Sequence, residues 1–423
     1  MGDKLVIAGI ANELDSNRRL AIAYGDPKTK MDTVFYPEIQ MRALGNLRVD
    51  PTNGDLIVIG FDFTNMLAHI TYVVRINSDM EIVKYVTNEE NFVSHFTDLA
   101  ILPSGTIYTI GMRNNDAGGN NDIMLTIFES DLSVRSRSFI GVAGRTDLGK
   151  SFVLHSNGNL YFSADVYSEF SETNCPSVYH IDTLGNVVWK TELDDPRSVD
   201  GCQEIYEDTD GNLLVVGENP MPNFLFDFVL AKLTPDGEIL FLDYRGWDDT
   251  HDAGFNIRPI EGGYLASGYS DEFSNGINKR GLCMKLDKGF NIIDTIIYPD
   301  DEAYITDMIE YEGEWFITGF KINAEDDLPV LWNITDFATT NSVDGVNPPS
   351  FHTKKTSINA KYWGTFLSNL SLDKSQRDAL LYDMNGAILG EGWEDIISFN
   401  PKYGNYIIRY NDGSTHFLNV FGN

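Results

Sequence analysis

Short apolar runs separated by polar turns follow the whole chain, and one type of run recurs at a nearly fixed interval. Each copy starts at a Gly-containing turn, continues as an apolar strand and ends in a small residue. The small residues are spaced by 51, 53, 53, 51 and 51 positions: Gly60, Gly111, Ala164, Gly217, Gly268 and Gly319. Gly9 lies 51 positions before Gly60 and ends the similar run "GDKLVIAG". This regularity predicts one repeat architecture that begins with the first residues of the chain.

A second marker, a strand followed by a turn as in "KLTPDGEIL", repeats with the same period. Its copies start at Arg75, Ile127, His180, Lys232 and Lys285, with steps of 52, 53, 52 and 53, and two shorter steps of 48 lead to Asn333 and Leu381. Each unit therefore contains four strands, which in residues 202–244 are "CQEIYED", "NLLVVGE", "FDFVLAKL" and "EILFLDY". Asp-Gly pairs stand at both tight turns of this unit, as hairpins require.

Four-stranded units of about 48–53 residues predict an all-β fold, a β-propeller, in which residues 1–423 form a single domain. The small residue that closes the second strand fits crowding between neighbouring blades. We favour eight blades, with seven as the alternative. The first unit begins at its second strand, so we expect the N- and C-terminal strands to pair and residues 394–423 to supply the closing strands. The predicted blade boundaries lie near residues 41, 93, 146, 198, 250, 302 and 357.

The stretch "DTDGNLLVVG", residues 208–217, resembles a calcium loop at its start. The equivalent turns of the other units read "PTNG", "LPSG", "HSNG", "IEGG" and "YEGE", which lack the carboxylates of Asp208 and Asp210. Calcium takes six to eight oxygen ligands, and the terminal Glu of an EF-hand loop is missing here. We interpret the stretch as a hairpin turn and predict no metal site.

The charge balance, 31 Lys and Arg against 63 Asp and Glu, gives a net charge of −32 that is spread along the chain. Such a surface repels phosphate backbones, so we expect no nucleic-acid partner. No window approaches the apolar length of a membrane span, and no secretory leader is visible in "MGDKLVIAGIANELD". The three cysteines are too few and too scattered for a disulfide framework or a zinc motif.

Residues 246–298 contain "GGYLASGY" and "KLDKGFNII", and residues 180–190 read "HIDTLGNVVWK". The first segment resembles bacterial β-propeller repeat proteins of the Gly-Gly-Tyr and Lys-Leu-Asp type. The second is distantly similar to a repeat of the PQQ propellers, including Trp189 at its end. The other units lack the equivalent Trp, and the regular Asp boxes of sialidases are absent as well. The resemblance therefore implies a propeller and speaks against both enzyme branches.

Candidate chemistry is sparse at the level of local motifs. The seven His residues form no metal-binding pattern, and no nucleophile elbow or phosphate-binding loop is present. The loop of residues 245–254 concentrates Arg245, His251 and Asp252 around the candidate ligand-binding residues Trp247, Asp248 and Asp249. An aromatic side chain beside carboxylates suits a sugar or a cation. The loops 113–122 and 165–175 vary most between units, and variable loops on a rigid scaffold are where partners bind.

With no catalytic motif, we predict a non-catalytic structural or interaction module, such as an attachment or assembly component of a virion or a cell-surface machine. The expected partner is a protein or a glycan, the expected location is a virion or the extracellular side, and no cofactor is expected. The alternative is a carbohydrate-active enzyme, a glycoside hydrolase or lyase. It would need two carboxylates about 5–10 Å apart, which a propeller can bring together from separate blades without any local motif.

Overall fold

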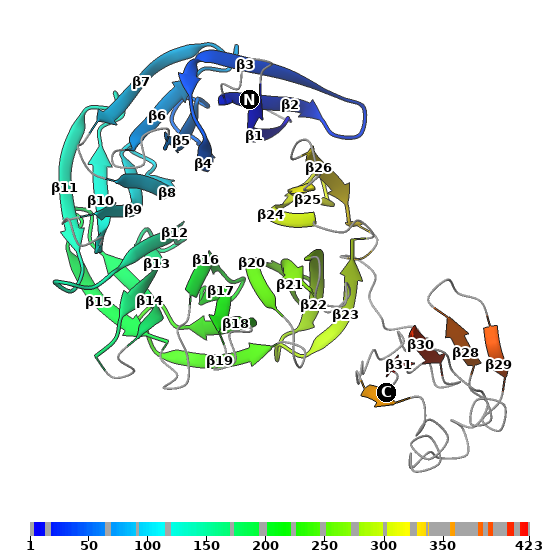
Figure 1. Cartoon of the computed structure of the whole chain (residues 1–423). Helices are drawn as coiled ribbons and strands as arrows, with labels where there is room; N and C mark the ends of the chain where they lie inside the picture. The colour runs from blue at the N-terminus through cyan, green and yellow to red at the C-terminus, as the bar shows by residue number, and fades with distance from the viewer. Residues whose placement is uncertain are drawn as a thin grey trace. The chain divides into compact units, whose positions relative to one another are not determined.

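The computed structural model describes residues 4–12, 18–63, 69–89, 93–114, 120–169, 173–193, 201–220, 226–245, 251–271, 279–298, 303–321, 328–335 and 337, and the strands of residues 356–359, 380–383, 388–391, 404–409 and 415–421. Seven antiparallel sheets of three or four strands follow one another in a ring (Figure 1). The chain is thus an all-β propeller with seven blades, the alternative that the repeat count left beside eight.

The first three sheets are built from consecutive strands. They are β1 (Leu5–Asn12), β2 (Arg18–Asp26) and β3 (Lys30–Gln40); β4 (Ala43–Val49), β5 (Leu56–Asp62), β6 (Ile70–Ile76) and β7 (Ile82–Glu89); and β8 (Ser94–Ile101), β9 (Ile107–Asn114), β10 (Asn121–Phe128) and β11 (Val134–Ile140).

The next four sheets repeat this order. They are β12 (Leu148–Leu154), β13 (Leu160–Tyr167), β14 (Asn174–Ile181) and β15 (Val187–Glu192); β16 (Gly201–Glu207), β17 (Leu213–Pro220), β18 (Phe226–Leu233) and β19 (Ile239–Arg245); β20 (Asp252–Ile260), β21 (Gly263–Ser270), β22 (Arg280–Asp287) and β23 (Ile292–Ile297); and β24 (Ala303–Tyr311), β25 (Glu314–Lys321) and β26 (Leu328–Asn333).

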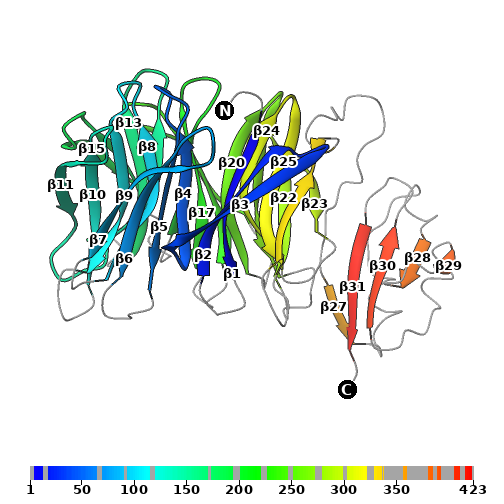
Figure 2. The same cartoon turned by 90° about the horizontal axis from the view of Figure 1, so that it is seen from above.

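Strands β4, β8, β12, β16, β20 and β24 lie nearest the centre of the ring (Figure 1), and we call them the inner strands. Each begins within three residues of a blade boundary predicted from the repeats. Figure 2 views the ring from the side, where the strands run from one face of the ring to the other. Apolar side chains of adjacent sheets fill the space between them. Tyr108 and Ile110 of the third sheet, for example, belong to one buried cluster with Phe162 and Tyr179 of the fourth.

Every inner strand has a β-bulge at the same place in the repeat. The register shifts occur between Leu44 and Asn46, Phe96 and Asp98, Gly149 and Ser151, Cys202 and Glu204, Gly254 and Asn256, and Ile305 and Asp307. One extra residue in each strand, such as Lys150 or Gln203, therefore has no partner on the second strand. Bulges of this kind redirect a side chain and are frequent beside active sites.

The small residue that closes the second strand is explained by the backbone of the inner strand. A Cβ added to Gly111 would collide with the carbonyl oxygen of His95, and one added to Gly217 would collide with that of Gly201. Crowding within one blade, rather than between blades as the sequence suggested, makes glycine necessary at these positions.

The first sheet differs from the others because it lacks an inner strand among the described residues. β1 corresponds in the repeat to the second strand β5, and it pairs with β2 alone. A Cβ on Gly9 would accordingly meet nothing within 4 Å. The first and last sheets are linked by Lys28, whose ammonium lies 2.8 Å from Glu314 and 3.6 Å from Glu312.

The chain divides into two compact units, residues 1–283 with 297–335 and residues 284–296 with 336–423. The C-terminal strands β27 (Thr356–Asn359), β28 (Leu380–Asp383), β29 (Ile388–Glu391), β30 (Gly404–Arg409) and β31 (Thr415–Phe421) form one sheet in the order β27-β31-β30-β28-β29.

Residues 394–423 were expected to pair with the N-terminal strand, but their described strands β30 and β31 pair with each other and with β28 and β27. The Asn-Asp-Gly sequence between β30 and β31 favours this local hairpin, which sequence periodicity cannot distinguish from a distant pairing. The organisation of residues 1–423 as one domain stays a prediction. No helix in the described part of the chain is long and apolar enough to cross a membrane.

Candidate active site

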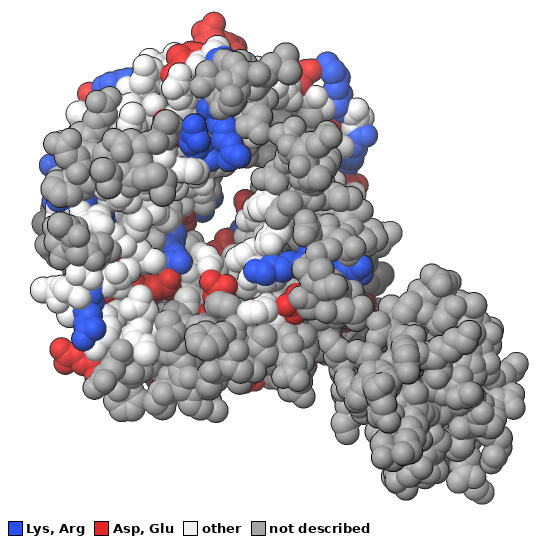
Figure 3. All heavy atoms as spheres, viewed as in Figure 1, with Lys and Arg blue, Asp and Glu red and all other residues white. Residues whose placement is uncertain are grey.

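One end of the ring gathers polar and aromatic side chains from consecutive blades. At this end the inner strands begin and the second strands finish, and we call it the mouth of the ring. Figure 3 shows a hollow in the middle of the ring with charged side chains along its border. Two repeat positions supply most of the residues: the extra residue of the bulge, and the residue directly after the small one. We name the following set the mouth cluster: His95, Lys150, Asp165, Gln203, Glu218, Tyr269, Lys279, Tyr304 and Phe320.

Lys150 and Asp165 form a buried ion pair in the fourth sheet. The Lys150 Nζ lies 2.8 Å from Asp165 Oδ2, and the backbone N–H of Cys202 donates to Asp165 Oδ1 over 2.5 Å. Burial lowers the pKa of the Lys150 ammonium, but the Asp165 carboxylate outweighs burial and leaves that pKa above its ordinary value. Lys150 therefore stays charged although its side chain is only 21% exposed.

Glu218 lies beside this pair. A Cβ built on Gly201, the first residue of β16, would lie 3.7 Å from Asp165 Oδ2 and 3.7 Å from Glu218 Oε1, so the two carboxylates flank the same glycine. Gln203, the bulge residue of β16, donates its side-chain N–H to Glu218 Oε1 over 3.2 Å. Gly201 thus places only backbone between the Asp165 and Glu218 carboxylates.

His95 continues the cluster on the other side of Lys150. Its ring stacks on Phe61 with 4.5 Å between ring centroids, and its Nδ1 is buried without a hydrogen-bond partner among the described residues. Burial, with smaller contributions from His69 and Lys150, lowers the pKa of His95 to about 4. The imidazole is therefore neutral near pH 7.

An aromatic wall forms the opposite side of the mouth cluster. The rings of Tyr269 and Tyr304 lie 5.5 Å apart, and Tyr304 stacks on Phe320 at 5.1 Å. The Lys279 Nζ lies 2.8 Å from the Tyr269 hydroxyl and 4.0 Å from the centroid of the Tyr269 ring. Burial lowers the pKa of Lys279, and Glu218 and Asp271 oppose this shift without cancelling it.

A second polar set on the inner strands has a structural role. It occupies the position after each bulge: Asn46, Asp98, Ser151, Glu204, Asn256 and Asp307. Asp98 accepts hydrogen bonds from Asn46 Nδ2 at 2.7 Å, Ser151 Oγ at 3.0 Å and the Phe152 N–H at 2.7 Å, and thereby ties three inner strands together.

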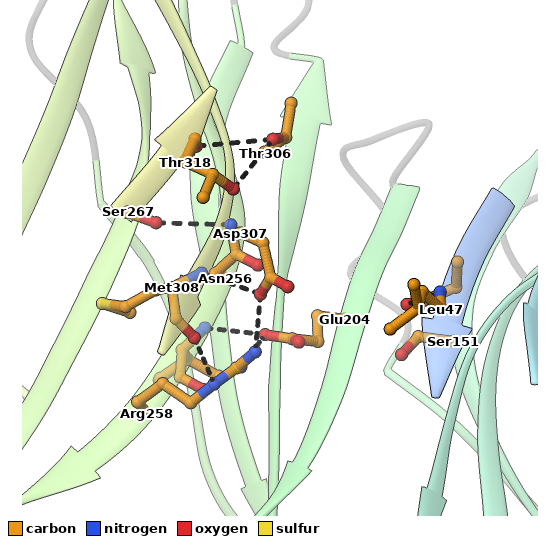
Figure 4. A network of polar contacts seen from close by, with 12 residues as sticks. Leu47, Ser151, Glu204, Asn256, Arg258, Ser267, Thr306, Asp307, Met308 and Thr318 are labelled. Atoms are coloured by element: carbon orange, nitrogen blue, oxygen red, sulfur yellow. Dashed lines mark hydrogen bonds and ion pairs between the residues drawn. The ribbon is translucent and has the colours of Figure 1, made fainter. Parts of the chain in front are cut away.

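Figure 4 shows the equivalent arrangement across the ring, where Glu204, Arg258 and Asp307 point toward one another from three neighbouring inner strands. Arg258 Nη1 lies 2.5 Å from Glu204 Oε2, and Arg258 Nη2 lies 3.0 Å from Asp307 Oδ1. The carboxylates of Asp98 and Glu204 are occupied by neighbouring blades, so we assign this set to ring assembly rather than to chemistry.

The stretch 208–211 forms the hairpin turn between β16 and β17, where the Gly211 N–H donates to the Asp208 carbonyl over 2.9 Å. The Asp208 carboxylate pairs with Lys232 and accepts a hydrogen bond from the Tyr264 hydroxyl at 3.0 Å. Within the described ranges, no group of three or more His, Cys, Asp or Glu could hold a metal ion. All three cysteines, Cys175, Cys202 and Cys283, are buried and form no disulfide.

The candidate residues chosen from the sequence, Trp247, Asp248 and Asp249, lie outside the described residues. The strands that flank them can be placed: β19 finishes and β20 begins at the mouth. The same holds for β9 and β10 around the loop 113–122, and for β13 and β14 around the loop 165–175. The role of these loops as binding sites stays a prediction.

The sequence analysis missed the mouth cluster itself. Aligning the repeats would have revealed it, because Asp165, Glu218, Tyr269 and Phe320 each directly follow the constant small residue and yet differ from unit to unit. A variable residue beside an invariant one marks a position that the fold leaves free for chemistry.

No family model matches the chain, and no curated protein matches it. Among solved structures, a puromycin hydrolase is similar, with a TM-score of 0.50, 13% identity, and coverage of 82% of this chain and 54% of that one. The chain therefore spans about half the length of that enzyme. A propeller domain of a protease from Pyrococcus furiosus matches at a TM-score of 0.44 with 10% identity, over 78% of this chain and 90% of that one. An apocarotenoid oxygenase from Synechocystis matches at 0.41 with 12% identity, over 69% and 71%.

The first of these comparisons contradicts the prediction of a non-catalytic structural or interaction module, because the similar structure at a TM-score of 0.50 is a hydrolase. At such low identity they show the fold, and the activity of this chain must be argued from its own residues. The prediction was wrong because it required a local catalytic motif. The mouth cluster is assembled from residues that stand about one repeat apart in sequence, so no local motif exists.

Proposed function

We propose that this propeller is a hydrolase that cleaves small amide or ester substrates at the mouth of the ring. One observation carries the proposal: the Glu218 and Asp165 carboxylates flank Gly201, and the charged Lys150 amine lies 2.8 Å from Asp165 Oδ2. A carboxylate can act as general base and a fixed cation can stabilise the developing oxyanion in the hydrolysis of a carbonyl compound.

Each residue has a distinct role in this reaction. Glu218 is the general base that takes a proton from water as the water attacks the carbonyl carbon, and it returns the proton to the leaving amine or alcohol. The Lys150 ammonium stabilises the negative charge that develops on the carbonyl oxygen. Asp165 and Gln203 are positioning residues, because they hold Lys150 and Glu218 in place.

The aromatic wall indicates the side chain that the substrate carries. Tyr269 is buried, and Tyr304 and Phe320 extend the aromatic wall from it, so an aromatic or large apolar group would pack against this wall. A free amino group on the substrate would be attracted to Asp271, which leaves the Glu218 carboxylate to the attacking water. We therefore propose substrates of the aminoacyl type with an aromatic side chain.

The test is turnover of phenylalanine 4-nitroanilide and of phenylalanine 4-nitrophenyl ester by the full chain. Glu218→Gln keeps the hydrogen bond to Gln203 but removes the base, and we expect kcat/KM to fall about 100-fold. Glu207→Gln is the matched control. Glu207 lies on the neighbouring inner strand β16, at the end away from the mouth, where it accepts a hydrogen bond from the Ser156 N–H over 2.8 Å. Equal rates for wild type and Glu218→Gln, in a protein of unchanged thermal stability, would refute the assignment.

Trp247, Asp248 and Asp249 fit this proposal as substrate contacts, because β19 finishes and β20 begins at the mouth. Replacing all three with Ala should raise KM about tenfold and leave kcat nearly unchanged, since these residues would bind the substrate without touching the reacting bond. The finer family resemblance, to bacterial repeats of the Gly-Gly-Tyr and Lys-Leu-Asp type, likewise remains a proposal that rests on residues 246–298.

A further inference from the structure

Lys279 has an environment unlike that of the ion-paired lysines described in the ring. Its amine lies on the face of Tyr269, 2.8 Å from the hydroxyl of that residue, and 6.0 Å from the centroid of the Tyr304 ring. Among the described residues it forms no ion pair with a carboxylate. Lys28, Lys150 and Lys232, in contrast, each pair with an acidic side chain.

The Lys279 side chain is also more exposed to solvent than that of the buried Lys285. Lys285 is only 6% exposed, whereas Lys279 is half-buried at the start of β22. Burial lowers the pKa of Lys279, so a larger fraction of its amine is uncharged near neutral pH than for an exposed lysine. An uncharged amine in a partly apolar site is the usual condition for a nucleophilic lysine.

We propose that Lys279 is a covalent ligand site, at which the amine forms an imine with an aldehyde that carries an aromatic group. The Nζ lone pair attacks the carbonyl carbon and gives a carbinolamine, with one proton passing from nitrogen to oxygen. Loss of the hydroxyl group as water, with loss of the second N–H proton, leaves the C=N bond. One aldehyde and one amine thus become one imine and one water, and no oxidant or reductant is needed.

The Tyr269 hydroxyl is placed to assist the dehydration step. It lies within hydrogen-bond distance of the nitrogen, and burial raises its pKa, so that it remains a proton donor at neutral and moderately alkaline pH. Phe255 packs on the same tyrosine at 5.5 Å, and Tyr304 and Phe320 extend the aromatic surface. An aromatic aldehyde can stack on this surface, whereas formaldehyde gains nothing from it.

The inference goes beyond the proposed hydrolase and is tested separately, because it is read by labelling and not by turnover. The full chain is incubated with benzaldehyde, reduced with sodium cyanoborohydride and analysed by peptide mass mapping. We expect Lys279 to gain a benzyl group at least about ten times faster than Lys30, which is highly exposed and pairs with Asp32. With formaldehyde in place of benzaldehyde, the preference for Lys279 should shrink.

Three variants complete the test. Lys279→Arg keeps the positive charge and should abolish the fast labelling, while Lys30→Arg, the matched control, should leave it unchanged. Tyr269→Phe keeps the ring but removes the hydroxyl, and should slow labelling of Lys279 severalfold without changing its site. Labelling that follows solvent exposure alone, with Lys30 modified first, would overturn the proposal even if Glu218 proves essential for hydrolysis.

Discussion

Single residues at the mouth of the ring gain their properties from burial and from the partners that the neighbouring strands supply. Lys150 and Lys279 show how the neighbouring side chain changes the pKa of a lysine amine. Lys150 is paired with Asp165 and remains charged, whereas Lys279 faces aromatic rings and its pKa is lowered. Two lysines at one mouth can therefore serve as an electrostatic group and as a nucleophile.

The His95 imidazole leads to a prediction on pH. The pKa of His95 is about 4 in the folded protein and 6.5 for an unperturbed histidine. Between these two pH values the imidazole is protonated in the unfolded chain and neutral in the folded protein. Stability is fully present above pH 6.5 and is lost as the pH falls toward 4, by about 3 kcal/mol in total. Burial also lowers the pKa of His69, which acts in the same direction.

Urea unfolding of wild type and His95→Phe at several pH values between 4 and 7 measures this contribution. The variant keeps a ring against Phe61 but has no titrating group, so its stability should fall less steeply with pH. Carboxylates titrate in both proteins and change the stability of both. The contribution of His95 is therefore the difference between the two curves of unfolding free energy against pH. Parallel curves would contradict the assigned shift.

At the level of strands, the inner-strand bulge explains why glycine closes the second strand. We predict that Gly111→Ala lowers the free energy of unfolding by about 2 kcal/mol, because the added methyl group meets the His95 carbonyl oxygen. Gly9→Ala should change it by no more than about 0.5 kcal/mol, because a Cβ there meets nothing within 4 Å. Denaturant unfolding of both variants gives the comparison. A loss at Gly9 as large as that at Gly111 would instead support the closing strand predicted from residues 394–423.

Sequence periodicity predicted the strands well and their chemistry poorly. The period of the small residues gave the propeller and the starts of six inner strands, because each blade must repeat the same backbone geometry. It overestimated the blade number, since residues 356–421 continue the strand pattern but form a sheet of different order. Which strands pair with each other depends on the turns between them and on side-chain packing. The pattern of apolar residues along the chain does not determine this pairing.

The site was harder to find because its members are distant in sequence. Lys150 and Glu218 become neighbours only when β12, β13, β16 and β17 are stacked, and each residue alone looks like an ordinary surface charge. Repeat alignment gives the position of such residues, while their burial, their partners and their shifted pKa values require the structure.

On the scale of the whole molecule, the net charge of −32 opposes folding into a compact ring. The buried pair of Arg258 and Glu204 and the more exposed pair of Lys28 and Glu314 respond differently to salt, since salt screens exposed charges much more than buried ones. The repulsion among surface carboxylates is exposed as well and involves far more charges than the few surface ion pairs. Added salt should therefore weaken repulsion more than it weakens attraction.

We accordingly predict that raising NaCl from about 0.02 M to about 0.5 M increases Tm by roughly 2 °C, a shift that about 1 kcal/mol produces in a large domain. Differential scanning calorimetry at fixed pH 7.5 measures it, and the same series on Lys28→Ala separates the contribution of the link between the first and last sheets. If that link depends on exposed ion pairs, the variant should lose stability at low salt and differ little from wild type at high salt. A fall in Tm with salt in the wild type would mean that the attraction within ion pairs outweighs the repulsion among the surface carboxylates.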